Sequence, residues 1–513
     1  MAAESQSLQM NVIKTMPSNS ENKDSKDIGE EGEIEKDQNS ASDERRDSQH
    51  DEFNNVVENA EALLTEFPTS LSDTFLLNPA ADMRKMRRII AEDPYWSLAT
   101  VPLLEELCIR HIVDNFEYNS IYFKSLRPAH KARVLETLSV NLPLKITAEL
   151  IEEECYWERC CRNRWALCNV ADYGNNWKRM YFERNLEHII EFFVPEKTDI
   201  RELNETLKVS SNFIKRIDIG QLLPPVTLDE KSIDFLDDGS DSPSEKEHEC
   251  DHFNMYPVMK ALTSLEELHL TYSVRDCGMN FTWSMFHFTK NDCQRLSEAI
   301  QSCKTLRVLH LHRSKIDDEK TRMLMYHLLD HPSMEEIDLS HNYIGDRGAK
   351  AIGKLITSCD RILKLTLCNN KIGIIGGQAL AHTLIKTHKL MLLNLRLNRI
   401  GDEGGHCIFK ALTKNTSLQE LNVAANKMGE STAIALSQVL RTNNNLVSID
   451  ISCNDLKQDG GKLIRESLEV NTTVTHLDLR LTNCGQEAEF RINQILDQNQ
   501  EANRERLLEE MRH

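Results

Sequence analysis

Apolar residues recur with a fixed period of 28 residues in the second half of the chain. The frame LxxLxLxxNxI, where x is any residue, begins at Leu306, Met334, Ile362, Leu390, Leu418, Leu446 and Val474. Consecutive copies at one period indicate a repeat architecture, in which each copy buries its apolar side against its neighbours. An earlier copy begins at Leu265, and FIKRIDI at 213–219 fits the same frame as a weaker first strand.

Each copy predicts a short strand followed by a helix. In LLNLRLN at 392–398, Leu393 and Leu395 alternate inward while Asn394 and Arg396 point outward. The period therefore predicts an α/β fold, a leucine-rich-repeat horseshoe of the ribonuclease-inhibitor-like kind, with parallel strands inside and helices outside. We expect a ladder of inward amides to satisfy buried backbone groups, namely Asn342, Asn370, Asn398, Asn426 and Asn454.

The remaining segments differ from the repeats in composition. We expect a disordered acidic tail over 1–80, a small all-α domain over 83–200, a first capping strand over 210–227, an acidic linker over 228–252, repeats over 260–486, and a helical C-terminal cap and tail over 487–513. The stretch MRRIIAEDPYWSL is expected to be helical, and His252 in the linker to be solvated.

The outward positions of the predicted strands form a polar concave face of mixed sign, which suits a protein partner better than a polyanion. The predicted partner-binding residues are His269, His310, His312, Asp338, Asn394, Arg396, Asn422, Asp450, Asp478 and Arg480. The histidines are interpreted as contact residues, because no nucleophile or acidic partner stands at a matched position. The alternative is that part of this face is merely solvated.

Composition adds exclusions. The 81 acidic and 61 basic residues give a net charge of −20, which disfavours nucleic acid and anionic membranes as partners. Much of this charge lies in residues 1–55 and 228–252, each with a net charge of −8. No apolar run reaches the length of a membrane span, and no secretory signal is evident, so we expect a soluble intracellular protein.

Candidate chemistry is sparse. No phosphate-binding loop, zinc-protease helix, nucleophile elbow or dinucleotide fingerprint occurs in the sequence. The cysteines at 155, 160, 161 and 168 lack paired CxxC spacing and are interpreted as core residues rather than zinc ligands. The sequence therefore predicts no catalytic, cofactor-binding or metal-binding residues, and hence a non-enzymatic protein.

One helix in the α domain carries a recognisable spacing. Leu104, Cys108 and Ile112 match the pattern LxxxCxxxI of an elongin-binding helix, and the segments that follow are similar to the F-box-like part of elongin A. The match departs at Leu103, where Thr, Ser or Pro is usual, and at Pro102, which comes one place early. Such an i, i+4, i+8 apolar row is also what a buried helix presents.

Several segments together resemble one family. They are MRRIIAEDPYWSLATVPLLEELC, WKRMYFERNLE, QLLPPV, DCGMNFTW and LNLRLNRIGDEGG, and the resemblance covers about 83–494. They are similar to the t-complex-associated testis-expressed family of leucine-rich-repeat subunits of the nexin-dynein regulatory complex. The resemblance implies a structural component of the axoneme in motile cilia and sperm flagella that helps to align outer doublets and regulate dynein-driven sliding.

The resemblance also implies partners and a location. Other regulatory-complex subunits, including another leucine-rich-repeat subunit, are the expected partners, with microtubule doublets or dynein arms as further neighbours in the cytoskeleton. The competing interpretation is an elongin/cullin ubiquitin-ligase substrate receptor that captures its substrate with the repeats. Co-elution with elongins B and C would separate the two.

Overall fold

The computed structural model describes residues 86–89, 99–195, 197–224, 251–280 and 283–512. The predicted tail over 1–80 and most of the predicted linker, up to residue 250, lie outside the described residues. The chain divides into two compact units, Met1–Leu104 and Glu105–His513.

The described part of the first unit is a hairpin. Strands β1 (Met86–Ile89) and β2 (Ala99–Pro102) pair antiparallel, with Met86 opposite Pro102. The helix predicted for MRRIIAEDPYWSL is therefore wrong over 86–89. The β-branched Ile89, Thr100 and Val101 favour extended backbone, a preference that apolar spacing alone does not register.

A helical region follows, and all of it except Leu104 belongs to the second unit. Its elements are α4 (Leu104–Asp114), α5 (Phe116–Asn119), η2 (Ser120–Ser125), α6 (Pro128–Thr137), α7 (Leu144–Leu150), α8 (Glu154–Arg164), η3 (Val170–Tyr173), α9 (Trp177–Glu191) and α10 (Ile200–Ser210). Trp157 is fully buried and lies 5.1 Å from Phe182 and 5.3 Å from Tyr181, measured between ring centroids. Cys160 and Cys161 are buried in the same core.

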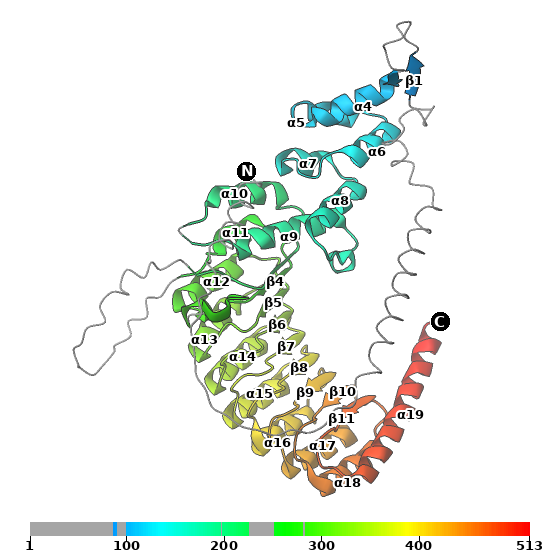
Figure 1. Ribbon diagram of the computed structural model, residues 1–513. Coiled ribbons are helices and arrows are strands. Elements are labelled where there is room, and N and C mark those ends of the chain that lie inside the picture. The colour runs from blue at the N-terminus through cyan, green and yellow to red at the C-terminus, as the bar shows by residue number, and fades with distance from the viewer. Residues whose placement is uncertain (1–85, 90–98, 196, 225–250, 281–282, 513) are drawn as a thin grey trace, which may run out of the picture. The chain divides into compact units, whose positions relative to one another are not determined.

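The repeats form a nine-stranded parallel sheet in sequence order (Figure 1). The strands are β3 (Arg216–Ile219), β4 (Glu267–Leu270), β5 (Val308–Leu311), β6 (Glu336–Asp338), β7 (Lys364–Thr366), β8 (Leu392–Asn394), β9 (Glu420–Asn422), β10 (Ser448–Asp450) and β11 (His476–Asp478). Each strand directly neighbours the next, as a solenoid requires. The predicted fold class is confirmed.

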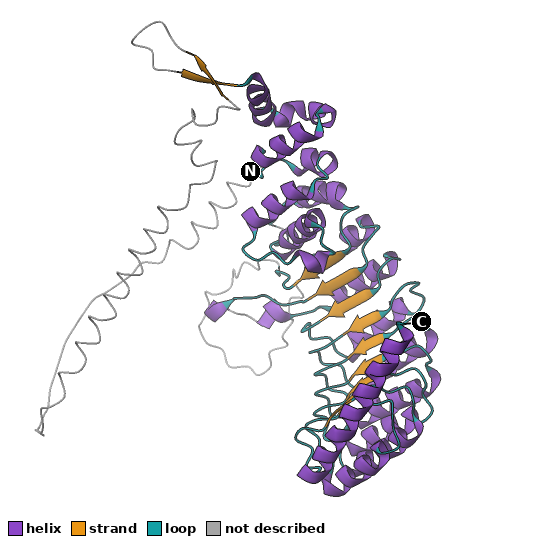
Figure 2. Cartoon of the chain, turned by 90° about the vertical axis from the view of Figure 1, so that its right-hand side faces the viewer, coloured by secondary structure: helices purple, strands orange, loops and turns teal. Residues whose placement is uncertain are grey.

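Among the described residues, the helices that connect successive strands lie on one face of this sheet and not on the other (Figures 1 and 2). They are α11 (Tyr256–Ala261), α12 (Lys290–Ser302), α13 (Asp318–Leu328), α14 (Asp346–Ser358), α15 (Ile374–Lys386), α16 (Gly401–Leu412), α17 (Glu430–Thr442), α18 (Lys457–Leu468) and α19 (Gln486–Glu510), while the insertion after β4 holds η4 (Gly278–Asn280) and η5 (Trp283–Phe286). The helix-free side is called the concave face below. Among the described residues, no helix combines the length and apolarity that crossing a bilayer requires.

Inward asparagines join successive repeats. Asn342 Oδ1 accepts from the backbone N–H groups of Ser314 (3.0 Å) and Ile316 (3.1 Å), and Asn342 Nδ2 donates to Leu311 O at 2.8 Å. The same position recurs with equivalent bonds in Asn370, Asn398, Asn426 and Asn454. These backbone groups are buried and cannot bond to water, so each amide supplies the hydrogen-bond partners that they need.

The first edge of the sheet is closed by carboxylates. Glu183 Oε1 accepts from Lys215 N (2.7 Å) and Arg216 N (2.9 Å), Glu187 Oε1 accepts from Asp218 N (2.8 Å), and Glu191 Oε1 accepts from Gly220 N (2.8 Å). Four helical residues rise about 6.0 Å and two strand residues about 6.6 Å, so the two spacings match. Helix α9 thereby satisfies the free N–H groups of β3.

At the other end of the array, side-chain amides of α19 bond to carbonyls of the segment that precedes β11. Asn499 Nδ2 donates to Asn471 O (2.9 Å) and Val474 O (3.0 Å), and Gln500 Nε2 donates to Thr475 O (2.7 Å).

The expectation that His252 is solvated is wrong. Its side chain is fully buried, and Nδ1 lies 2.7 Å from Asp292 Oδ2. Asp292 also belongs to the capping box that Thr289 forms at the start of α12. The partner lies 40 residues away, so the acidic composition around His252 gave no sign of this burial.

Candidate functional site

The concave face carries the predicted partner-binding residues in two adjacent rows. The middle row is in register across all nine strands and contains Asp218, His269, His310, Asp338, Thr366, Asn394, Asn422, Asp450 and Asp478. The next row lies two residues further along and contains Thr271, His312, Ser340, Cys368, Arg396, Ala424, Ser452 and Arg480. All ten predicted residues thus lie on one face, between β4 and β11.

Five of these residues hold their own turns. The side-chain oxygens of Asp338, Asn394, Asn422, Asp450 and Asp478 each accept from the backbone N–H two residues later, at 2.8–3.1 Å. This is the Asx-turn geometry, which stabilises the point where a strand ends. One oxygen of each side chain therefore already accepts a hydrogen bond from its own turn. The prediction that these residues contact a partner did not anticipate this bond.

The two arginines point outward in different settings. Arg480 is bonded to Asp478, with Nη2 2.5 Å from Oδ2, although its side chain is 83% exposed. Arg396 is exposed and follows the Asx turn of Asn394. A partner that binds Arg480 must compete with Asp478 for its guanidinium group. Arg396 is exposed and can be contacted without breaking that ion pair.

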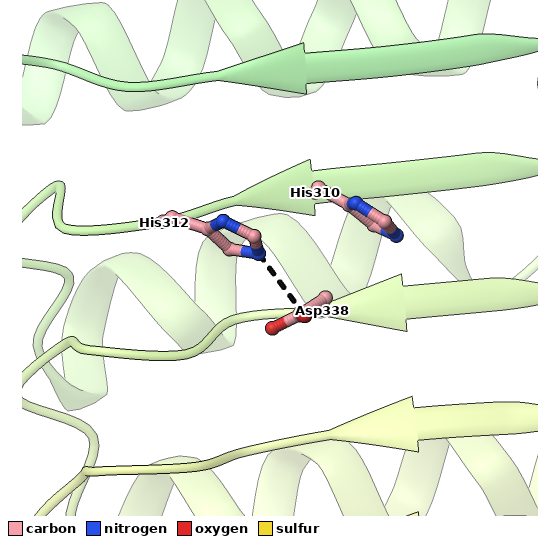
Figure 3. Close-up of side chains that lie close together, drawn as sticks. All are labelled: His310, His312 and Asp338. Carbon is pink, nitrogen blue, oxygen red and sulfur yellow. Dashed lines mark ion pairs between the residues drawn. The ribbon is translucent and has the colours of Figure 1, made fainter. Parts of the chain in front are cut away.

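Three histidines gather at the start of the array. The rings of His269 and His310 stack at a centroid distance of 4.1 Å, and those of His310 and His312 lie 5.4 Å apart. His312 Nε2 lies 3.0 Å from Asp338 Oδ2 on the next strand (Figure 3). This contact supplies the acidic partner that the sequence did not reveal.

The electrostatics of this cluster follow from burial. Burial and the neighbouring His310 lower the pKa of His269 to about 4, so its ring is neutral at pH 7. Burial raises the pKa of Asp338, but the close contact with His312 and the hydrogen bonds from Ser340 outweigh this effect, and the net pKa is lowered. Asp338 is therefore a carboxylate at neutral pH.

A third outward row was missed. It lies two residues before the middle row and includes Glu336, whose Oε1 is 3.0 Å from His310 Nε2 and whose Oε2 is 3.1 Å from Lys364 Nζ. Strand alternation places this position on the same face, so extending the register by one step would have found it.

A hollow of about 590 Å³ opens beside the histidines. Its lining includes His312, Asp338, Ser340, His341 and Cys368. The site can therefore admit a side chain or a small ligand.

Helix α4 presents part of the predicted elongin-type row. Leu104 is 76% exposed and Cys108 is exposed, while Ile112 is partly buried against the core. Glu105 and Glu106 pair with Arg133 of α6, which fixes the side of α4 that faces the domain.

One comparison with known proteins, the family model, supports the repeat assignment. A family model described as Leucine Rich repeat matches residues 330–353, 387–409 and 442–464. An internalin from Listeria monocytogenes is a solved structure with 20% identity and a TM-score of 0.28, covering 44% of this chain and 65% of that chain.

Relatives with one name match about half of the chain. A Homo sapiens protein named dynein regulatory complex subunit 5 is 50% identical over 281 residues, covering 54% of this chain and 56% of that protein. Proteins of the same name are 49% identical in Macaca fascicularis over 282 residues (54% and 56%) and 33% identical in Chlamydomonas reinhardtii over 220 residues (43% and 50%). The chain spans about half the length of these curated relatives.

Proposed function

We propose that the chain is a non-enzymatic structural component of the dynein regulatory complex in the axoneme of motile cilia and flagella. The observation that carries this proposal is the 33–50% identity to proteins of that name from an alga and from mammals. In this role it helps to align outer doublets and to regulate dynein-driven sliding. Its partners are other subunits of the complex, including another leucine-rich-repeat subunit, with microtubule doublets and dynein arms close by.

The fold suits this role mechanically. Each repeat is bonded to its neighbours through the sheet and the Asn ladder, so load passes along one continuous core. The polar concave face then offers a long surface for a protein partner.

Localisation tests the proposal directly. A tagged chain expressed in ciliated cells should reach the axoneme, and this localisation should be lost in cells that lack other regulatory-complex subunits. A chain that stays in the cell body, or reaches the axoneme without those subunits, would contradict the proposal.

Charge reversal tests the concave face. We expect Arg396→Glu combined with Arg480→Glu to abolish co-precipitation of other regulatory-complex subunits, because both side chains are exposed on this face. The matched control is Lys386→Glu with Lys410→Glu, which makes the same charge change at exposed positions of α15 and α16. Equal assembly of both double variants, with unchanged circular dichroism, would exclude the concave face as the contact.

The exposed row on α4 supports a second candidate, an elongin/cullin substrate receptor. If the row binds elongin, Leu104→Asp with Cys108→Asp should abolish co-elution with elongins B and C. Leu107→Asp is the matched control, since Leu107 is 41% exposed on the same helix but lies outside the row. Absence of elongin from the unaltered protein's elution peak would remove this candidate.

A further inference from the structure

The histidine cluster has the donor set of a metal site. His310 and His312 stand two residues apart on one strand end, so both imidazoles project from the concave face. Asp338 pairs in register with His310 on the neighbouring strand. One ligand atom from each of the three side chains can be chosen so that all lie within 4.8 Å of one another (Figure 3).

We propose that His310, His312 and Asp338 bind a divalent transition-metal cation, with zinc as the best match. Zinc takes imidazole nitrogen and carboxylate oxygen at about 2.0–2.2 Å, so tetrahedral ligands lie about 3.4 Å apart. The contact of 3.0 Å between His312 Nε2 and Asp338 Oδ2 is already within that spacing. His310 completes the set, with its ligand atom no more than 4.8 Å from those of His312 and Asp338.

Glu336 acts as a positioning residue for His310. Its contact with Nε2, at 3.0 Å, assigns Nδ1 of that ring to the metal. A carboxylate on the second ring nitrogen is the usual arrangement around a metal-bound histidine, because it fixes the orientation of the ring. Lys364 holds the other oxygen of Glu336 at 3.1 Å.

The donor set and its surroundings favour zinc over hard cations. Two imidazoles and one carboxylate suit zinc, copper or nickel, whereas magnesium and calcium prefer oxygen ligands alone. His312 and Asp338 both line the hollow of about 590 Å³, so the remaining coordination positions open into it. Water or a side chain of a bound protein completes the shell there.

Cobalt(II) and zinc titrations of the purified full chain, after treatment with a chelator, test the site. We expect one equivalent of zinc to bind that is lost in His310→Ala combined with His312→Ala, and at least tenfold weaker binding in Asp338→Asn. Cobalt should give a visible d–d spectrum without a thiolate charge-transfer band, because the ligands are nitrogen and oxygen.

The matched control removes two other histidines. His382→Ala with His476→Ala changes two exposed residues, one on α15 and one at the far end of the sheet, and should bind zinc as the unaltered chain does. Melting temperatures measured with chelator confirm that each variant folds. Equal zinc stoichiometry and affinity in the unaltered chain and in the His310/His312 variant would overturn the proposal, as would cobalt bound only through thiolate.

Discussion

The two ends of the repeat array are capped by opposite chemistry. At β3, the carboxyl groups of Glu183, Glu187 and Glu191 accept hydrogen bonds from backbone N–H groups. Beyond β11, the amides of Asn499 and Gln500 donate to backbone carbonyls. The first cap is made of titratable groups and the second is not, so only the first should respond to pH.

Loss of Glu183 should produce the largest effect. Its side chain is fully buried and accepts from two backbone N–H groups and from Arg179 Nε at 2.7 Å. Glu183→Ala leaves these donors unpaired, and we expect the free energy of unfolding to fall by about 3 kcal/mol in urea titrations. A loss below about 1 kcal/mol would show that water replaces the carboxylate and that the first edge does not depend on it.

Asn499→Ala tests the other end of the array. The amide is 7% exposed and makes two hydrogen bonds, so its removal should cost about 2 kcal/mol, measured in the same titrations. The exposed Asn493, six residues earlier on α19, provides the control, because Asn493→Ala should be nearly neutral. If both substitutions cost the same, the amide bonds of Asn499 do not stabilise this end of the array.

The pH dependence should separate the two caps. Burial raises the pKa of Glu187 to about 8, with Asp218 and Glu183 adding to the effect, while the hydrogen bond from Asp218 N and the charge of Arg216 oppose it. A raised carboxyl pKa stabilises the fold below about pH 4.5, and this contribution is lost as pH rises through about 8.

The stability of the Glu187→Gln variant, relative to that of the unaltered chain, should therefore increase as pH rises. Between pH 5 and 9, we expect the difference in unfolding free energy to shift by at least about 1.4 kcal/mol in favour of the variant, the equivalent of one pKa unit. Asn499→Ala should run parallel to the unaltered chain over the same range. A Glu187→Gln curve that also runs parallel would contradict the raised pKa.

Glu191→Gln should have the smallest effect, because the amide oxygen still accepts from Gly220 N. We expect a change within about 0.5 kcal/mol by thermal unfolding at neutral pH. A larger loss would indicate that charge, rather than the acceptor itself, closes this end of β3.

The repeat array could be predicted from the sequence because each repeat follows from its own local pattern of apolar residues. The 28-residue frame fixes which side chains alternate inward, so the strand register, and with it the concave rows, could be derived from positions such as Leu393 and Leu395. The same frame located the asparagines, whose bonds reach the same groups in each adjacent repeat.

The other features depend on contacts between distant parts of the chain, which the 28-residue repeat does not predict. Glu183, Glu187 and Glu191 are spaced like an ordinary solvated helix face, and only the edge of β3 gives them donors. The burial of His252 required Asp292, and the pairing of His312 required a side chain on another repeat. Asx turns were missed because an outward Asp or Asn was interpreted by its direction and not by the backbone two residues on.

The caps have a further consequence for solubility. An uncovered edge strand offers its backbone to another chain, and here the two edges belong to parallel strands of one sheet. Without the caps, β11 of one molecule could add to β3 of a second in a head-to-tail contact, and such a contact does not close into a ring unless its rotation permits. Helix α9 occupies the edge of β3, so this edge is not open to β11 of a second molecule.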